Sequence, residues 1–304
     1  MLFHQTAVRF NRRIARPILG RFLDANGYAR IGAGFRPINV TAADLTAQAG
    51  DTGKAADILN RYGIVVLRDF IDPGLADAAR HEADALAARL EAALATPEDH
   101  GTVDGIVWQV DGALLRKHAA IEAQGRPWAN IRSREPDAVN RGVIDFFFID
   151  RSARENGWRA LEACCDALQS PAAGEVIGRL SPARFRRANM LRSDSVTVTR
   201  GLHVDNLESS YKVFLYLSDV QGPDDGPYAY VPGSHRRLDL LRREARLNGL
   251  LGRMETDSYA FAGHEVALTA RRGDAIISCQ TGVHRGLPQR AGASRTVLVG
   301  NYRA

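Results

Sequence analysis

The second half of the chain consists of short apolar or alternating segments separated by turn-forming residues. Examples of these separators are Pro232-Gly233 and Gly273-Asp274. Short strands joined by such turns are typical of an antiparallel β-sandwich or barrel. We therefore expect a β-rich core built mainly from this half of the chain. The candidate strands cover residues 184–191, 195–203, 211–217, 228–231, 266–269, 275–279, 283–286 and 295–302.

The first half predicts helices that cover this core, with one buried strand among them. Residues 54–62 favour a short helix, and Gly63 then begins the β-branched run GIVVLRDF, which suits a buried strand. Asp72 followed by Pro73 is a typical helix start, with Asp72 as the N-cap. We expect that helix to run to about residue 95 and another to cover residues 154–168.

Residues 96–150 are open to two interpretations. The segment is rich in Gly and Pro, and it contains Trp108, Trp128 and the run DFFFID at 145–150. It could form a lid over a pocket, in which case its aromatic side chains would contact a substrate. It could equally form ordinary hairpins whose aromatic side chains pack in the core.

The N-terminal segment has a composition of its own, so we divide the chain into an extension at 1–50 and a single domain at 51–304. Residues 1–23 carry five arginines and no acidic residue, with apolar side chains between the charges. This amphipathic pattern could lie on a membrane surface. It could also be an extension that packs on the domain or on a second subunit. Pro17 interrupts any long helix there.

Composition excludes several classes of protein. With 45% hydrophobic and 25% charged residues among 304, the chain has ordinary globular values. It contains no apolar run of the roughly 18–20 residues that a membrane span needs. Its three cysteines, Cys164, Cys165 and Cys279, cannot form a disulfide framework, which favours a reducing, cytoplasmic compartment.

Arginine supplies nearly all of the positive charge, because lysine occurs only at Lys54, Lys117 and Lys212. The guanidinium group pairs well with carboxylates and phosphates. The arginine excess therefore fits an anionic or carrier-linked small-molecule substrate, although genomic base composition explains this excess, and the net charge of +5, more simply. We expect no nucleic-acid partner.

A candidate metal site lies in the predicted sheet. His203 and Asp205 stand two residues apart at the end of a candidate strand, so both side chains point to one face. His284, at the start of a later strand, is the best third ligand. Two histidines and a carboxylate form the facial triad of non-haem Fe(II) oxygenases, which leaves coordination positions open. Zinc is compatible with the same ligands, so a zinc hydrolase is an alternative.

Arg295, on the strand that follows His284, adds a second requirement. A guanidinium group at this position could hold a distal carboxylate through two parallel hydrogen bonds. A dicarboxylic keto acid would then bridge the metal and Arg295. A zinc hydrolase has no use for this arginine.

These residues together resemble the phytanoyl-CoA dioxygenase family of Fe(II)- and 2-oxoglutarate-dependent oxygenases. The matching pieces are the run GIVVLRDFIDP at 63–73, the HVD at 203–205, DDGPYAYVPGSH at 224–235, GDAII at 273–277, His284 and Arg295. The resemblance covers residues 54–304. It implies a mainly β fold: a double-stranded β-helix (jelly-roll, cupin-like) core with flanking helices.

The resemblance also implies roles for these residues. His203, Asp205 and His284 would be the iron ligands and catalytic centre, and Arg295 would bind 2-oxoglutarate. Tyr216 falls where relatives often place a residue beside 2-oxoglutarate. By their positions in this chain, Thr197 and Thr199, on the strand before His203, are further candidate contacts to 2-oxoglutarate, and Asn206 and Arg285, next to the expected iron ligands, are candidate substrate contacts. After His284 the chain has Gln289 and Arg290 where the family usually has Asn.

The expected activity is hydroxylation of an unactivated C–H bond of a small molecule, with O2 consumed and succinate and CO2 released. Desaturation or cyclisation at the same iron site is an alternative. Halogenation is disfavoured, because related halogenases lack the carboxylate found here at Asp205. An opposing hypothesis is a non-catalytic jelly-roll protein that binds a metal or ligand. The oligomeric state is expected to be monomer or homodimer.

Overall fold

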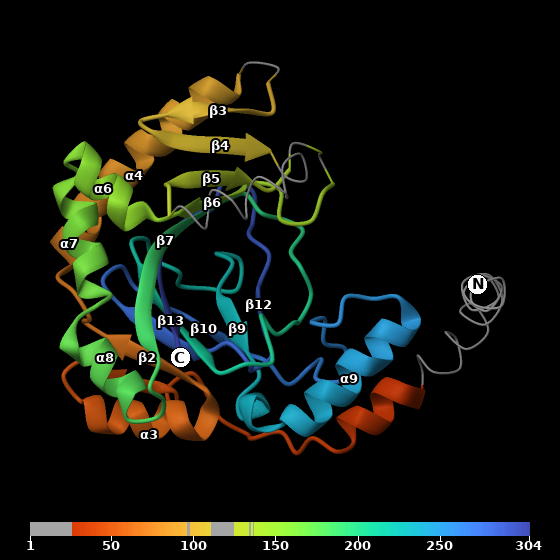
Figure 1. Ribbon diagram of the computed structural model, residues 1–304. Coiled ribbons are helices and arrows are strands. Elements are labelled where there is room, and N and C mark those ends of the chain that lie inside the picture. The colour runs from red at the N-terminus through yellow and green to blue at the C-terminus, as the bar shows by residue number, and fades with distance from the viewer. Residues whose placement is uncertain (1–25, 96–97, 111–124, 134, 136) are drawn as a thin grey trace, which may run out of the picture.

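The computed structural model describes residues 26–95, 98–110, 125–133, 135 and 137–304, and the amphipathic segment predicted at 1–23 lies outside them. Two β-sheets face each other in these parts of the chain (Figure 1). The large sheet has the order β1-β2-β11-β8-β13-β7-β6-β5-β4-β3, and the small sheet has the order β10-β9-β12. Side chains join the two sheets, as in the hydrogen bond between Tyr228 Oη of β9 and Ser278 Oγ of β11 at 3.0 Å.

The strands of the large sheet are β1 (Thr46–Gln48), β2 (Ile64–Arg68), β3 (His100–Val103), β4 (Ile106–Val110), β5 (Trp128–Ile131), β6 (Val143–Phe147), β7 (Arg184–Asp194), β8 (Ser210–Tyr216), β11 (Ala275–Cys279) and β13 (Ser294–Arg303). The small sheet contains β9 (Tyr228–Tyr230), β10 (Val266–Leu268) and β12 (His284–Gly286). Most neighbouring strands are antiparallel, but β1–β2 and β4–β5 are parallel. The prediction of a mainly β jelly-roll core with flanking helices is confirmed.

Helices cover the outer face of the large sheet. They are α3 (Thr52–Tyr62), α4 (Pro73–Leu94), α6 (Ile149–Asn156), α7 (Arg159–Ala167) and α8 (Pro171–Gly178). Figure 1 shows α4, α6, α7 and α8 along one side of the sheet and α3 below it. A further helix, α9 (Leu238–Leu251), lies apart from these beside the helical segment 26–32. The two are joined by the hydrogen bond from Tyr28 Oη to Asn248 Oδ1.

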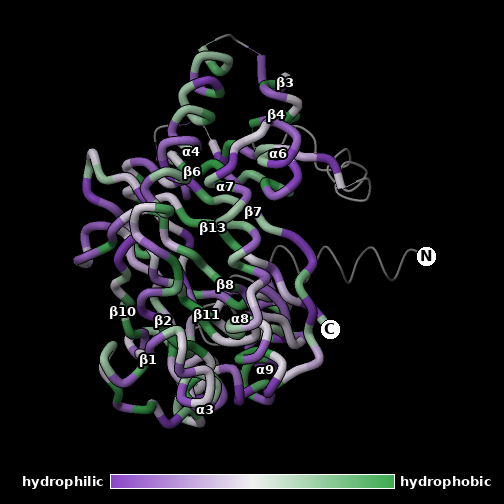
Figure 2. The backbone as a smooth tube through the Cα atoms, turned by 90° about the vertical axis from the view of Figure 1, so that its left-hand side faces the viewer, coloured by the Kyte–Doolittle hydropathy of each residue, from purple (hydrophilic) through white to green (hydrophobic). Residues whose placement is uncertain are grey.

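The hydrophobic core lies between these helices and the large sheet. Val213, Leu215 and Leu298 are fully buried there. Figure 2 shows that hydrophobic residues are concentrated along β8, β11 and β13. None of the described helices is long and apolar enough to cross a membrane.

Several local predictions are confirmed. Asp72 is the N-cap of α4, where its Oδ1 accepts hydrogen bonds from the backbone N–H groups of Gly74 and Leu75. Residues 98–110 and 125–150 include strands that extend the large sheet, which agrees with the hairpin interpretation. The ring of Trp128 there stacks on Phe147 at 4.0 Å.

Two predicted elements are wrong. The single helix expected at 154–168 is divided between α6 and α7 by Gly157, whose φ of 70° breaks the helix. The strand expected at 195–203 does not form. Its alternating pattern would have buried both Val196 and Val198, but Val198 is 42% exposed. The backbone there forms separate hydrogen bonds to loops instead of a ladder, for example from Asn140 N to Val198 O.

The Gly273-Asp274 turn links two neighbouring strands of the large sheet, β2 and β11. The buried Asp274 carboxylate accepts hydrogen bonds from the backbone N–H groups of Asp69 and Arg271, and it pairs with Arg68 at 2.5 Å. This one side chain therefore joins the end of β2 to the start of β11. An aspartate serves here because it accepts several hydrogen bonds while it balances a charge.

We predict that Asp274→Ala lowers the free energy of unfolding by about 2–4 kcal/mol, because it leaves Arg68 and two N–H groups without their acceptor. Urea denaturation monitored by circular dichroism measures this. Asp239→Ala, which removes an exposed partner of Arg237, is the control and should cost less than about 1 kcal/mol. Equal losses for the two variants would contradict the assigned role of Asp274.

Candidate metal centre

The two candidate histidines are joined through their backbones. His203 N donates to His284 O at 2.9 Å, and His284 N donates to His203 O at 2.9 Å. This pair is an isolated antiparallel bridge between the loop at 195–209 and strand β12. His203 thus reaches the site from a loop and not from a strand as predicted. Because the two residues are directly opposite, their rings lie on the same side, with centroids 4.6 Å apart.

Both imidazole rings are oriented by backbone carbonyl groups. His203 Nδ1 lies 2.9 Å from Gly201 O, and His284 Nδ1 lies 2.9 Å from Gly282 O. A carbonyl oxygen can only accept a hydrogen bond, so Nδ1 carries the proton in both rings. The Nε2 atoms are left with free lone pairs, which is the form of histidine that binds a metal.

Asp205 completes the cluster. Its Oδ1 lies 3.8 Å from His203 Nε2 and 3.6 Å from His284 Nε2. One candidate ligand atom from each of the three residues lies within 4.8 Å of the other two, which is close enough for all three to reach one ion. The second carboxylate oxygen of Asp205 pairs with Lys212 Nζ at 2.5 Å.

The electrostatics of the cluster favour the metal-binding protonation states. Burial, reinforced by the neighbouring His284, lowers the pKa of His203 to about 4. Burial alone would raise the pKa of Asp205, but Lys212 and His284 hold it below its ordinary value. Near neutral pH the site therefore offers a neutral imidazole at His203 and an ionised carboxylate.

The turn Pro232-Gly233-Ser234 holds the strand that carries His284. Gly233 has a φ of 81°, and the buried Ser234 hydroxyl donates to Val231 O at 2.7 Å. The same hydroxyl accepts a hydrogen bond from Val283 N at 2.8 Å, directly before His284. His235 points elsewhere, with Nε2 3.2 Å from Asn60 O. It is a turn residue and not part of the cluster.

A cavity of about 300 Å³ opens beside the three candidate ligands. Its walls include residues of the inner face of the large sheet and of the small sheet. Among its lining residues are Leu191, Ser193, Phe214, Tyr228, Gln289 and Arg295. The ring of Tyr228 on β9 stacks on His284 with centroids 5.4 Å apart, so the neighbouring strand of the small sheet also holds the histidine ring in place.

Arg295 is partly buried in the wall of this cavity, and loss of solvation lowers its pKa although Tyr216 opposes the shift. Its guanidinium group donates to Gly226 O and lies 3.4 Å from Ser193 Oγ. Its Nε has no hydrogen-bond partner, and no carboxylate among the described residues forms an ion pair with it. A partly buried guanidinium group with no carboxylate partner favours an anionic ligand.

Of the other residues predicted to contact 2-oxoglutarate or the substrate, only one lines the cavity. Thr199 lines the cavity, whereas Thr197 is exposed and does not. Tyr216 lies fully buried next to Arg295 but outside the cavity wall, and burial raises its pKa to about 12. Arg285 points away and pairs with Glu265 at 2.8 Å. Asn206 donates to Ser210 Oγ at 3.1 Å and lines a neighbouring cavity.

Sequence analysis missed Lys212, Ser193 and Gln289. Lys212 is one of only three lysines, and the alternation of β8 places it on the same face as Phe214. Gln289 Oε1 accepts a hydrogen bond from Val196 N at 3.1 Å, so it anchors the loop that leads to His203. No local pattern marks that long-range contact. Asp225, in the DDG sequence, forms a turn by accepting from Gln221 N and Gly222 N.

No protein-family model and no curated protein sequence matches the chain. Among solved structures, it is similar to AviO1 from Streptomyces viridochromogenes, with 15% identity, coverage of 84% of this chain and 95% of AviO1, and a TM-score of 0.52. It is also similar to the non-heme α-ketoglutarate-dependent epimerase SnoN of nogalamycin biosynthesis (15% identity, 84% and 83% coverage, TM-score 0.50).

A third similar structure is the non-heme α-ketoglutarate-dependent carbocyclase SnoK of nogalamycin biosynthesis (18% identity, 87% and 86% coverage, TM-score 0.50). At these identities the likeness establishes a shared fold. The fold is thus shared with the non-heme α-ketoglutarate-dependent enzymes SnoN and SnoK.

We predict that His203→Ala, Asp205→Ala and His284→Ala each weaken Fe(II) binding by more than about 100-fold, since each removes a direct ligand, and even outer partners of ligands change metal affinity about 10- to 100-fold. Anaerobic titration calorimetry measures the affinity. The exposed His81 on α4 provides the control variant His81→Ala, which should bind Fe(II) like the unaltered protein. If one of these three variants keeps full affinity for Fe(II), the residue it replaces is not a ligand.

Proposed function

We propose that this protein is an Fe(II)- and 2-oxoglutarate-dependent oxygenase of the phytanoyl-CoA dioxygenase family that oxidises a small molecule. The observation that carries the proposal is the pairing of two features in one cavity. A two-histidine, one-carboxylate cluster stands beside it, and an arginine without a carboxylate partner lines its interior. The first feature suits Fe(II), and the second suits the far carboxylate of the cosubstrate.

The donor set fits iron. His203 and His284 present Nε2 atoms, and Asp205 presents one oxygen, on one side of the ion only. Such a facial set leaves positions for a chelating keto acid and for O2. Lys212 holds the second oxygen of Asp205 and so favours its binding through a single oxygen.

Arg295 fits the 2-oxoglutarate C5 carboxylate. The guanidinium group can donate two parallel hydrogen bonds to a carboxylate, and its Nε is available. Ser193 and Gln289 provide further polar groups at this end of the cavity. Apolar Leu191 and Phe214, which also line it, would exclude water from the bound cosubstrate.

When bound, iron and 2-oxoglutarate would together activate O2 as the oxidant, and 2-oxoglutarate would give up two electrons and leave as succinate and CO2. The residues of this chain hold these groups and position the substrate C–H bond. Hydroxylation is the proposed outcome. The fold is shared with an epimerase and a carbocyclase, so desaturation or cyclisation of a suitably placed substrate would use the same site.

The competing functions account for fewer of these features. A zinc hydrolase would use the three ligands but would leave Arg295 in the cavity without a partner. A non-catalytic binding protein would not require open coordination positions beside a second anion site. We further propose that the enzyme acts in the cytoplasm as a monomer or homodimer, on a small molecule and not on nucleic acid.

We predict that anaerobic addition of Fe(II) and 2-oxoglutarate produces the weak visible charge-transfer band of the chelate. The zinc hydrolase and the non-catalytic protein should both lack this band. Absorption spectroscopy under argon detects it, and the His81→Ala protein should give the same band. If the unaltered protein binds both components without producing the band, the proposed function is wrong.

We also predict that Arg295→Ala raises the apparent KM for 2-oxoglutarate by about 30- to 4,000-fold, because the carboxylate loses its charged partner at a cost of roughly 2–5 kcal/mol. Arg295→Lys keeps the charge without the planar fork and should give a smaller increase. The KM for the primary substrate should change little. Pyruvate, which lacks the far carboxylate, should be a poor replacement for 2-oxoglutarate, and the Arg295→Ala enzyme should discriminate less between them. An unchanged KM for 2-oxoglutarate would assign the carboxylate to another arginine.

A further inference from the structure

The backbone at His203 is held from two sides. On one side it pairs with His284 of β12, and on the other it lies opposite Asp257 in a second antiparallel bridge. The residue after His203 takes part in this second pairing, because Val204 N donates to Thr256 O at 2.9 Å. The position of His203 therefore depends on both neighbouring segments.

The side chains around His203 alternate between two surroundings. His203 and Asp205 face the candidate metal centre, whereas Leu202 and Val204 are buried on the other side. Leu202 and Val204 belong to a hydrophobic cluster separate from the main core, with Phe35, Val231, Leu240, Leu241, Phe261 and Val283 as its other buried members. Two of these members come from α9, so this helix packs behind the stretch that carries two of the three candidate ligands.

Helix α9 also holds the segment at 256–260 through the carboxylate of Glu244. Its Oε1 accepts hydrogen bonds from Tyr259 N at 2.6 Å and from Ala260 N at 2.7 Å. Its Oε2 accepts a hydrogen bond from Ser258 Oγ at 2.9 Å. One side chain of α9 thus binds three consecutive residues of this segment.

Asn248 of α9 adds a fourth hydrogen bond to the segment at 256–260. Its Nδ2 donates to the backbone oxygen of Asp257, the residue opposite His203, at 2.6 Å. Its Oδ1 accepts the hydrogen bond from Tyr28 Oη. The contacts of α9 therefore end one backbone pairing away from a candidate metal ligand.

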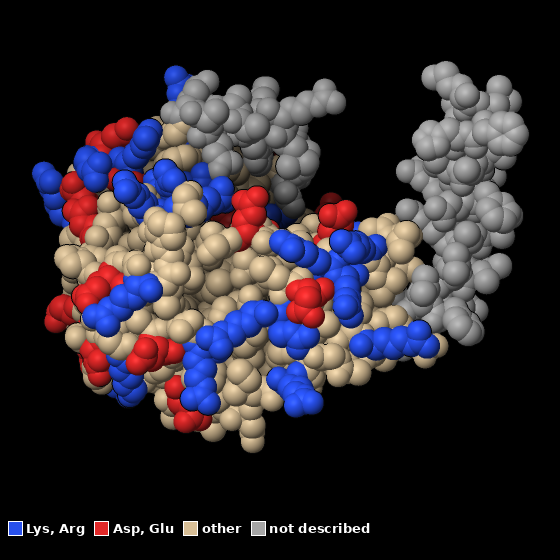
Figure 3. Space-filling view, turned by 60° about the horizontal axis from the view of Figure 1, so that its bottom comes forward, with Lys and Arg blue, Asp and Glu red and all other residues tan. Residues whose placement is uncertain are grey.

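Glu244 is an unusual residue for this position. Charged side chains stand at the surface on the face turned forward in Figure 3, whereas Glu244 is 1% exposed and forms no ion pair with the described residues. A buried carboxylate loses its hydration, and without a cation only hydrogen bonds replace it. The three hydrogen bonds to the segment at 256–260 therefore account for a charged side chain here.

We propose that Glu244 is a positioning residue of the candidate metal centre, which holds His203 and Asp205 in place through the segment at 256–260. Glu244 does not line the cavity beside the ligands. It fixes the segment opposite His203, and that segment completes the backbone pairing on which both ligands depend. This inference rests on the proposed function for the role of the site, and it adds a residue outside the cavity to that function.

Hydrogen–deuterium exchange of the metal-free protein measures how firmly the backbone at His203 and Val204 is held. Glu244→Ala removes three hydrogen bonds, so the two N–H groups should exchange faster by about tenfold or more. Glu244→Gln should keep most of the protection. Its amide oxygen can still accept from the two backbone N–H groups, and the Ser258 hydroxyl can turn to accept from its amide nitrogen.

Fe(II) affinity, measured by anaerobic titration calorimetry, is the second readout. Glu244→Ala should weaken Fe(II) binding by about 10- to 100-fold, the usual effect of losing a residue that supports a metal ligand from outside. Glu244→Asp keeps the charge but shortens the side chain, so it should weaken binding more than Glu244→Gln, which keeps the length without the charge. This order distinguishes a role in geometry from a role of the charge itself.

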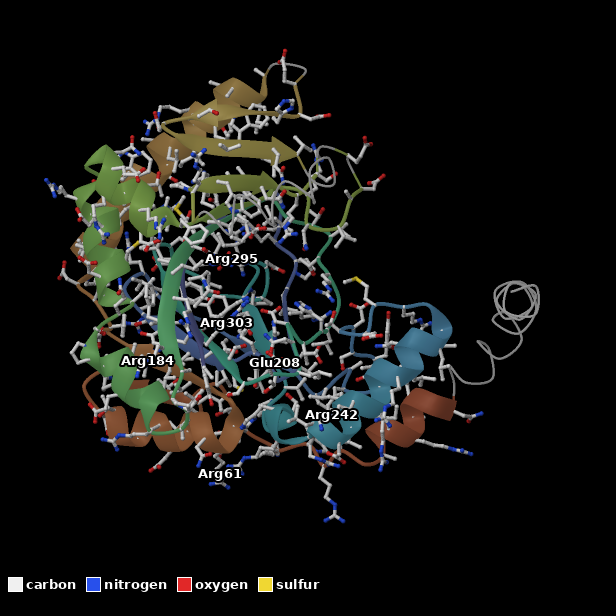
Figure 4. All side chains as sticks on the ribbon, viewed as in Figure 1. Arg61, Arg184, Glu208, Arg242, Arg295 and Arg303 are labelled. Carbon is white, nitrogen blue, oxygen red and sulfur yellow. The ribbon has the colours of Figure 1, made fainter. Side chains whose placement is uncertain are left out.

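Two controls separate positioning from a general loss of stability. Asp274→Ala removes another buried carboxylate that accepts backbone hydrogen bonds, at the junction of β2 and β11. It should lower the stability of the fold without weakening Fe(II) binding or speeding exchange at His203. Arg242, labelled in Figure 4, is an exposed residue of α9 itself, so Arg242→Ala should leave both readouts unchanged.

All variants are compared at a temperature at which circular dichroism shows them folded, and Glu244→Asp decides the test if Glu244→Ala does not fold. The inference is overturned if the variant used leaves exchange at His203 and Val204 unchanged. It is also overturned if that variant and Asp274→Ala weaken Fe(II) binding equally. By contrast, an unaltered protein that binds no Fe(II), or lacks the visible band with 2-oxoglutarate, contradicts the proposed function.

Discussion

The site depends on the two reciprocal backbone hydrogen bonds between His203 and His284. They hold a loop against the small sheet and bring together two histidines that are far apart in the sequence. Backbone carbonyl groups of Gly201 and Gly282 then orient both rings in the same way. The shape of the cluster is thus determined by the main chain, and Asp205 follows because it lies on the loop that the bridge holds.

Two basic side chains near this cluster, Lys212 and Arg295, differ in how their charges are balanced. Lys212 pairs with Asp205 in the cluster, whereas Arg295 on β13 forms no ion pair with the described residues. A partly buried guanidinium group without a carboxylate partner would gain from an anionic ligand, so Arg295 favours one.

Much of the fold and two of the three candidate ligands could be predicted from the sequence, because they depend on local patterns of residues. Strand-and-turn patterns give most of the sheets, Asp72-Pro73 gives the start of α4, and the spacing of His203 and Asp205 gives two members of the cluster. The strand predicted at 195–203 was wrong because alternation alone does not reveal that Val198 stays exposed. Lys212 and Gln289 were missed because their contacts with Asp205 and Val196 depend on how distant segments pack.

The most direct test is a crystal structure of the protein grown under argon with Fe(II) and 2-oxoglutarate. Our account predicts one iron ion bound by Nε2 of His203, Nε2 of His284 and one oxygen of Asp205. It also predicts that the 2-oxoglutarate C5 carboxylate pairs with Arg295. Iron bound elsewhere, or a cosubstrate whose far carboxylate does not reach Arg295, would contradict it.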